Sequence, residues 1–379
     1  MPQDIFSLCD ALVEETAALS PVLATMVGVR GYDHLWDDFS TAGQEHAREA
    51  LESQLGRVRA ADTGGEPDGM LAAEVAAAAI EDELSQFGTS EHLRDLNNID
   101  SGLQHLRDVF EHMGKGSREE WEAIAARLAG LPAAAEAYRG RLEDGKRLGL
   151  AVARRQAVEG ARQARHAAGG ASALRRLAAE WEAAGLDDAV LGARVAAGID
   201  GARAAFGVLA DYLEKDYLPS TAEADGVGEE RYSRRARRFL GSAPDLQQTY
   251  AWGWEEIARL LRRMEETAEA IMPGASRPEV LRLLAEDPAR AASSPEEFRA
   301  AMQARQETAL RDLEGAHFDV PEPIRRVEVK LAPPGGALGA FYVGPSEDFT
   351  RSGTVWFAIG EQQVVPLFDQ VTTNYHEGF

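Results

Sequence analysis

The sequence predicts a mainly α-helical protein, an irregular array of long helices with a small β-sheet near the last residues. Apolar residues recur with a helical period from the start to about residue 318, and the helix-favouring residues Ala, Arg, Glu and Leu dominate these stretches. After residue 326 the period changes to the alternation that is typical of strands. No repeat of fixed period occurs, so a regular solenoid is disfavoured.

Local start signals place several of the helices. Ser20-Pro21 predicts an N-cap followed by a first-turn proline, and Ser40-Thr41 opens a helix that ends near Ala61. The pattern from Ser117 to Glu120 is that of a capping box. Ser294-Pro295 combines a cap with a first-turn proline, followed by acids that the helix dipole favours.

Composition and periodicity predict further helices between these starts. An Ala-rich helix is expected over residues 70–87, after a loop over residues 63–69, and another helix over residues 91–113. Trp121, Ile124 and Leu128 have the spacing of one buried helix face.

Strands are expected only near the end of the sequence. Residues 327–331 alternate apolar with charged side chains, and residues 333–336 (Pro-Pro-Gly-Gly) form a turn. Residues 340–344 and 353–360 are candidate second and third strands, after which the pattern becomes helical again. The sequence therefore divides into a helical region, residues 1–320, and a strand cluster with the first turns of another helix, residues 321–379.

Composition excludes several classes of protein. Hydrophobic residues make up 45% and charged residues 27% of the 379 residues, as in globular proteins. The net charge of -23 disfavours nucleic acid and anionic membranes as partners. Cys9 is the only cysteine, so no disulfide can form within the chain. Residues 1–20 lack the features of a signal peptide and the apolar stretches are too short to span a bilayer, which predicts a cytoplasmic location.

The most specific chemical signal is His376-Glu377, close to the last residue. A His followed directly by Glu opens the zincin signature H-E-x-x-H, in which the His binds zinc and the Glu deprotonates the attacking water. The pair follows the strand cluster at the start of a helical pattern, which is the order found in zincins. We therefore expect His376 to bind zinc and Glu377 to act as general acid and base.

Other polar clusters have simpler explanations. His105 and His112 lie two turns apart on one predicted helix, too far to bind one ion together. Asp33, Asp37 and Asp38 surround His34 in a pattern that is typical of a turn with capping carboxylates. The basic run over residues 234–238 is expected to be a solvated helix face. Trp252 and Trp254 are expected to pack between helices.

Five segments, taken in order, resemble one known family, the bacterial "domain of unknown function 885" proteins, which are metallopeptidase-like and related to the zincins. The resemblance runs along nearly the whole chain. The segments are PVLATMVGVRGYDHLWDDFS, IAARLAGLPAAAEAYRGRL, AFGVLADYLEKDYLPSTAEADGVGEERY, AFYVGPSEDFTRSGTVWFAIG and TTNYHEGF. The last one is the first half of the family motif His-Glu-Gly-x-Pro-Gly-His.

The resemblance implies zinc at His376 and an acid–base role for Glu377. It also implies that a downstream part supplies the next His and an acidic ligand, so the chain is expected to be truncated within the motif and inactive as it stands. The family motif has a proline four residues after its first His, so the usual i, i+4 ligand pair is not formed in the standard way. Tyr342, Arg351 and Tyr375 are the candidates for substrate contact, with sheet packing and surface ion pairing as their alternative roles.

The function expected from these observations is that of a zinc-dependent metallopeptidase or amidohydrolase acting on a peptide or a small peptide-like amide. Two alternatives remain open. One is a non-catalytic helical binding module, in which His376 and Glu377 are incidental. The other is a family member that has been repurposed for a biosynthetic step on an amide-containing small molecule. The sequence leaves the oligomeric state undetermined.

Overall fold

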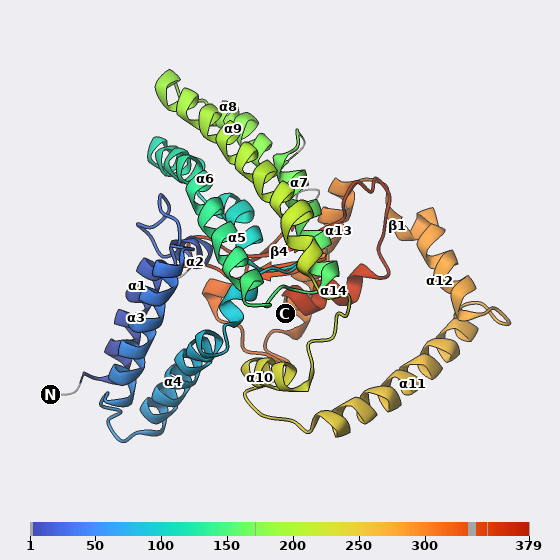
Figure 1. The fold of residues 1–379 in the computed structure, drawn as a ribbon. Helices are drawn as coiled ribbons and strands as arrows, with labels where there is room; N and C mark the ends of the chain where they lie inside the picture. The colour runs from blue at the N-terminus through green and yellow to red at the C-terminus, as the bar shows by residue number, and fades with distance from the viewer. Residues whose placement is uncertain (1–2, 171, 333–338, 347, 379) are drawn as a thin grey trace. The chain divides into compact units, whose positions relative to one another are not determined.

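The computed structural model describes residues 3–170, 172–332, 339–346 and 348–378. Helices dominate the described chain and its strands form only small sheets, which confirms the predicted mainly α fold (Figure 1). The chain divides into two compact units. The first unit is Met1–Asp225 with Ala332–Gly339 and Val343–Gly353, and the second is Gly226–Leu331 with Ala340–Tyr342 and Thr354–Phe379.

The first unit begins with helices whose start signals lie in the sequence. They are α1 (Ile5–Leu19), α2 (Pro21–Val27), α3 (Thr41–Arg59) and α4 (Pro67–Gly88). Ser40 caps α3 as predicted, because its hydroxyl accepts a hydrogen bond from the Gly43 amide at 3.1 Å. The loop predicted over residues 63–69 is shorter than expected, because Pro67 already occupies the first turn of α4.

The main core of the first unit lies among longer helices. They are α5 (Gly102–Asp108), α6 (Arg118–Arg147), α7 (Arg154–Ala168), α8 (Ala173–Ala184) and α9 (Ala189–Tyr212), with the single turns η1 (Glu91–Arg94), η2 (Val109–Glu111), η3 (Leu213–Tyr217) and η4 (Leu218–Ser220). The capping box predicted at Ser117 and Glu120 is present at the start of α6. Trp121, Ile124 and Leu128 are all fully buried, which confirms the predicted apolar face.

The single helix predicted over residues 91–113 is wrong. The structure has the turn η1, a loop over residues 95–101, then α5 and η2. The side chain of Asn97 accepts hydrogen bonds from the amides of Ile99 and Asp100, at 2.7 and 2.8 Å. Such an Asx turn offers the backbone an alternative to the helix, so the polar residues of this loop interrupt the helical period.

Among the aspartates around His34, Asp37 is a capping carboxylate of α2, as predicted. Asp37 accepts hydrogen bonds from the Ser20 hydroxyl at 2.8 Å and from the Val22 amide at 2.9 Å, at the start of α2. Asp33 accepts a hydrogen bond from the Thr25 hydroxyl at 2.7 Å, further along the same helix. Hydrogen bonds from these carboxylates therefore stabilise the short helix α2.

Arg127, on α6, is a fully buried guanidinium. It donates hydrogen bonds to the Leu35 carbonyl at 2.8 and 2.9 Å, the Tyr32 carbonyl at 3.1 Å and the Thr25 hydroxyl at 2.8 Å. It also lies over the ring of Trp36. Burial lowers the pKa of Arg127 to about 10, against the opposing charges of nearby aspartates. This one side chain therefore holds the segment that follows α2 against α6.

The second unit contains the remaining helices and most of the strand residues of the two small sheets; Val343 and Gly353 fall in the first unit. Its helices are α10 (Glu229–Leu240), α11 (Leu246–Ile271), α12 (Arg277–Glu286), α13 (Pro295–Leu313) and α14 (Gln370–Gly378), with the turns η5 (Pro288–Arg290) and η6 (Glu322–Ile324). Its strands are β1 (Ala291–Ala292), β2 (Val327–Leu331), β3 (Phe341–Val343), β4 (Gly353–Phe357) and β5 (Val365–Pro366). The strands predicted over residues 327–331, 340–344 and 353–360 are therefore present. The turn predicted at 333–336 lies outside the described residues.

The core of the second unit lies between α13 and the three-stranded sheet, whose order is β2-β4-β3. The central strand β4 is buried along its whole length. Phe298 of α13 meets Phe357 of β4 edge to face, with ring centroids 5.3 Å apart. The short strands β1 and β5 pair antiparallel, with Ala292 opposite Val365. The cap predicted at Ser294 is present, because its hydroxyl accepts a hydrogen bond from the Glu297 amide.

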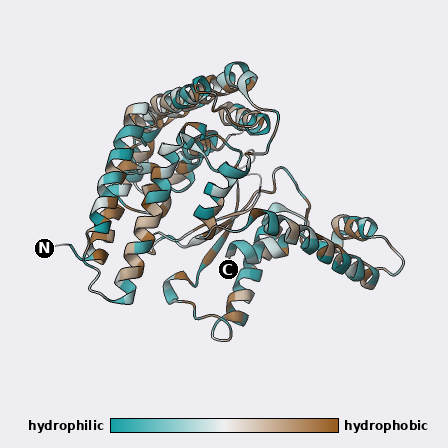
Figure 2. Cartoon of the chain, turned by 60° about the horizontal axis from the view of Figure 1, so that its bottom comes forward, coloured by the Kyte–Doolittle hydropathy of each residue, from teal (hydrophilic) through white to brown (hydrophobic). Residues whose placement is uncertain are grey.

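Hydrophobic and hydrophilic residues are interleaved along the helices, as Figure 2 shows in brown and teal. No helix among the described residues is both long enough and apolar enough to cross a bilayer. The packing predicted for Trp252 and Trp254 is wrong, because the structure leaves these residues 61% and 58% exposed. α11 thus carries large apolar side chains that the described chain does not cover.

Candidate functional site

The helix that carries His376 and Glu377 is α14, and Asn374 holds it against α13. Asn374 is buried and its side-chain amide donates a hydrogen bond to the Met302 carbonyl at 3.3 Å. In return, the side-chain amide of Gln306 donates to the backbone carbonyl of Asn374. Both partners lie on α13, so these side-chain-to-backbone bonds fix the rotation of α14 about its own axis.

Gly378, the third residue of the His-Glu-Gly sequence, lies in close contact with α13. A Cβ atom added at this position would overlap the side-chain amide of Gln306. Asn374 and Gly378 are four residues apart and therefore lie on the same face of α14. The face of α14 that meets α13 is set by these two residues.

His376 and Glu377 lie outside that contact face. At 100° per residue, His376 is about 200° around the helix from Asn374, and its side chain is exposed. Glu377 is half-buried on the flank. Within the described part of the chain, neither ring nitrogen of His376 has a hydrogen-bond partner. The rotation set by Asn374 and Gly378 therefore leaves this imidazole available to an external ligand.

The described residues do not by themselves form a metal site. Zinc in a catalytic site takes three protein ligands and keeps one position open. No group of three or more His, Cys, Asp or Glu side chains suited to one ion occurs among the described residues. His376 and Glu377 therefore provide one imidazole and one carboxylate, and the described chain does not complete the ligand set.

Two of the predicted substrate-contact residues lie in the same unit as His376. Tyr375 is its neighbour on α14 and is 39% exposed. Tyr342 is the middle residue of β3 and is 41% exposed, and burial of its hydroxyl raises its pKa. On the opposite face of β3, Phe341 stacks on Trp356 with ring centroids 6.0 Å apart. The side chain of Tyr342 is therefore not part of that aromatic stack.

Arg351 belongs to the first unit, whereas α14 belongs to the second. Its guanidinium donates hydrogen bonds to the carbonyls of Thr25, at 3.5 Å, and Met26, in the last turn of α2. Burial lowers the pKa of Arg351, and Asp33 and Asp348 oppose that shift. A cation at this position satisfies carbonyls that the end of a helix leaves open, and it interacts favourably with the helix dipole.

The three-stranded sheet has two edge strands, and a side chain forms hydrogen bonds with the backbone of one of them. The amide of Gln303 on α13 donates to the Val327 carbonyl at 3.0 Å and accepts from the Val329 amide at 2.9 Å, both in β2. β3 is the other edge strand. An edge strand can take an extended peptide by backbone pairing, and β3 is the edge strand that Gln303 does not engage. Sequence reasoning missed Gln303, Gln306 and Asn374.

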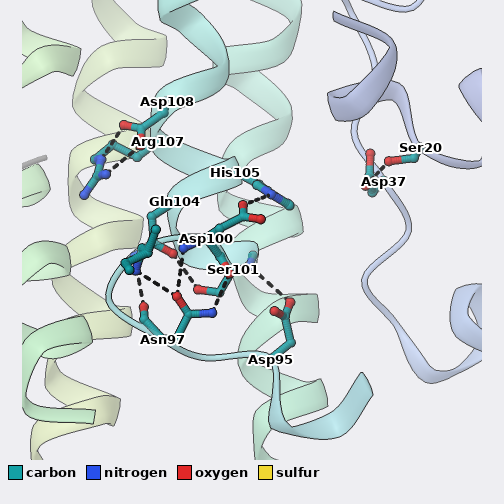
Figure 3. Close-up of polar contacts among 12 residues, drawn as sticks. Ser20, Asp37, Asp95, Asn97, Asp100, Ser101, Gln104, His105, Arg107 and Asp108 are labelled. Atoms are coloured by element: carbon teal, nitrogen blue, oxygen red, sulfur yellow. Dashed lines mark hydrogen bonds and ion pairs between the residues drawn. The ribbon is translucent and has the colours of Figure 1, made fainter. Parts of the chain in front are cut away.

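A second polar cluster, also missed from the sequence, lies in the first unit (Figure 3). Gln104 donates to Gln163 at 3.0 Å, and Arg107 donates to the same oxygen at 2.8 Å. The Ser101 hydroxyl donates to Gln104 at 2.6 Å, and Gln163 donates to the Asn98 carbonyl at 2.9 Å. Each amide thus has its partners inside the protein, so this network positions α5, α7 and the loop before α5.

His105 lies at the edge of this cluster, 2.7 Å from Asp100 (Figure 3). Burial opposes protonation, but the hydrogen bond to Asp100 and the charges of Asp100, Asp95 and Asp37 raise the pKa of His105. His112 follows η2 and is not on the same α-helix, so the predicted shared helix face is wrong. The pairing with Asp100 gives His105 an ion-pair role.

The structure defines a mainly α protein with a small sheet and, on α14, an exposed His376 next to a half-buried Glu377. Residues 21–379 match the family model described as "Bacterial protein of unknown function (DUF885)". The chain therefore belongs to the DUF885 family. No protein with a curated description matches it.

Solved structures share this fold. A crystal structure of a putative lipoprotein from Colwellia psychrerythraea matches with a TM-score of 0.80 and 17% identity, over 98% of this chain and 70% of that chain. A putative lipoprotein of unknown function from Shewanella oneidensis matches with a TM-score of 0.62 and 12% identity, over 99% of this chain and 68% of that chain. At these identities the similarity concerns the fold alone.

Proposed function

We propose that this chain belongs to a zinc-dependent metallopeptidase or amidohydrolase of the zincin type, acting on peptides or peptide-like small molecules. The observation that carries the proposal is the rotation of α14. Asn374 and Gly378 face α13, so His376 is exposed and its ring nitrogens have no partner within the described chain. A histidine with only a packing role would be expected to turn toward a neighbouring element instead.

In the proposed enzyme, His376 is one zinc ligand and Glu377 is the acid–base residue beside it. A bound zinc ion supplies Lewis acidity, which polarises an amide carbonyl and lowers the pKa of water. The described residues complete neither the ligand set nor the reaction. The remaining ligands would come from outside them, as the family motif implies.

The edge strand β3 supports a peptide-like substrate. Phe341 and Tyr342 of β3 belong to the same unit as α14, and the backbone of the other edge strand is engaged by Gln303. In the proposal an extended substrate pairs with β3, and Tyr342 and Tyr375 contact it. Arg351 is not included, because its guanidinium bonds to the carbonyls of α2. The net charge of -23 supports a substrate other than nucleic acid.

Zinc analysis tests the proposal, using the longest polypeptide that the same reading frame encodes. We expect about one zinc per chain, and His376→Ala should weaken zinc binding at least tenfold. His317→Ala is the matched control, because His317 is an exposed histidine of the same unit. Glu377→Gln should retain zinc but lose hydrolysis of a peptide library. Equal zinc content in the wild type and in His376→Ala would exclude the metal role.

A non-catalytic helical binding module is the second candidate. The exposed tryptophans of α11 favour it, because large exposed apolar surfaces mark interaction sites. Hydrolysis of a peptide library by the wild type and not by Glu377→Gln would exclude it.

A further inference from the structure

α11 presents a continuous apolar stripe to solvent. Of its residues, only Ala268 is buried in the described chain. The α11 stripe consists of the apolar residues on one face: Tyr250, Trp254, Ile257, Leu261, Met264, Ala268 and Ile271. Tyr250 is 66% exposed, and the others except Ala268 are also exposed. Single exposed apolar residues are ordinary, but a stripe of this kind marks an interaction surface.

The spacing of the α11 stripe is that of a helix–helix seam. Its members alternate between steps of four and three residues from Tyr250 to Ile271. This is the spacing of the a and d positions in a heptad, which place every member on the side that meets a partner helix. At 1.5 Å per residue the stripe is about 30 Å long. A second helix of similar length could pack along all of it.

Within the described part of the second unit, α12 covers part of this face. Among the described residues, α12 is the only element with which α11 shares more than marginal contact. Between the two helices lies an apolar groove of about 360 Å³, lined by Met264 and Ala268 of α11 and by Val280, Leu281 and Leu284 of α12. The groove extends the apolar surface at one end of the stripe and leaves Tyr250 and Trp254 uncovered.

The hydrophobic core of the second unit does not reach these helices. The core cluster is built from α13, the strands and the segments beside them, and no described residue of α10, α11 or α12 belongs to it. A helix is normally stabilised by burial of its apolar face, and a 26-residue helix with one buried residue lacks that contribution. The second unit is therefore incomplete as a hydrophobic unit.

We infer that the α11 stripe docks an amphipathic helical segment of the same polypeptide, from a part of the family fold that these 379 residues do not include. The two solved structures match nearly all of this chain but only 70% and 68% of their own chains. This fold is therefore found with further chain, amounting to about three-tenths of those proteins. The inference does not depend on the proposed zinc site.

Hydrogen exchange of the α11 amides tests this assignment in metal-free buffer. The 379-residue chain is compared with the longest polypeptide that the same reading frame encodes. We expect at least tenfold slower exchange in the longer polypeptide, independent of protein concentration. Leu261→Asp and Ile257→Asp should abolish this protection. Arg262→Asp is the matched control, because Arg262 is exposed and lies off the stripe on the same helix. Circular dichroism checks that each variant is folded.

Three results would overturn the assignment. The reading frame could encode nothing beyond these residues, or α11 could exchange equally fast in both polypeptides. Alternatively, protection of the 379-residue chain could increase with its concentration while sedimentation shows a dimer, which would assign the stripe to a second copy. Because no step uses zinc, equally fast exchange or a dimer leaves the metal analysis untouched, and loss of zinc binding leaves the docking result untouched. A reading frame that encodes nothing further would count against both proposals, because the remaining zinc ligands would also be missing.

Discussion

The buried guanidinium of Arg127 is the centre of a polar cluster in the first unit. Arg127 bonds to the carbonyls of Tyr32 and Leu35 and to the Thr25 hydroxyl, while Asp33 and Asp37 lie near enough to affect its pKa. Removing one partner of such an arrangement leaves buried polar groups unsatisfied, which costs more than the hydrogen bonds contribute when they are present. The stability of this site thus depends on the guanidinium.

Arg127→Met should therefore destabilise the first unit strongly. We expect a loss of about 3 kcal/mol in the free energy of unfolding, because a thioether of similar length cannot donate to the carbonyls that Arg127 satisfies. Urea denaturation followed by circular dichroism measures the change. Arg162→Met is the control, since Arg162 is a half-exposed surface residue paired with Glu159, and its loss should cost about 0–1 kcal/mol. Equal costs for the two variants would contradict the role assigned to Arg127.

At the scale of elements, α14 depends on one close contact. Gly378→Ala adds a Cβ that overlaps the Gln306 side-chain amide, so either this amide must leave the Asn374 carbonyl to which it donates or α14 must shift away from α13. We expect a cost of about 1–3 kcal/mol in the docking of α14, as for other overpacked contacts. Hydrogen exchange of the α14 amides measures that docking directly.

Gly253→Ala provides the matched control for this prediction. Gly253 lies within α11, and a Cβ added there meets no atom within 4 Å. Alanine is the better helix former by about 1 kcal/mol, so this variant should be neutral or stabilising. If Gly378→Ala left the exchange of α14 unchanged, close packing would not be the reason for glycine in the His-Glu-Gly sequence.

The helices of the structure also show which features of the fold were predictable from the sequence. The caps at Ser40, Ser117 and Ser294 were predicted correctly, because a cap depends on residues three positions apart. The prediction of one helix over residues 91–113 was wrong, because the Asx turn at Asn97 forms in place of continuous helix. The helical pattern around His376 is confirmed, since periodicity is a local property.

The contacts that orient the candidate site were beyond sequence reasoning. Gln303 and Gln306 read as ordinary polar helix residues, and only tertiary packing brings them to β2 and α14. The error at Trp252 and Trp254 has a related cause. Periodicity identifies the apolar face of a helix, but it does not say whether the described chain supplies a partner for that face.

At the scale of the whole molecule, the two units differ in how much apolar surface they bury. The core cluster of the first unit draws on α5 to α9 and includes Trp121, Tyr138 and Phe206. The cluster of the second unit is much smaller and excludes α10 to α12. Because burial of apolar surface is the main favourable contribution to folding, the second unit should be the less stable one.

We therefore expect the 379-residue chain to unfold in two steps, with the second unit first, since units with separate cores need not unfold together. Phe298→Ala removes a buried ring from the second core and should lower the midpoint of the first step only. Trp121→Ala should lower the second only. Each truncation should cost about 3–5 kcal/mol within its own unit. Hydrogen exchange measured across a urea series follows α13 and α6 separately. If both substitutions shifted both steps equally, the chain would unfold as one cooperative body, and the small core beside α14 would have to draw stability from the first unit.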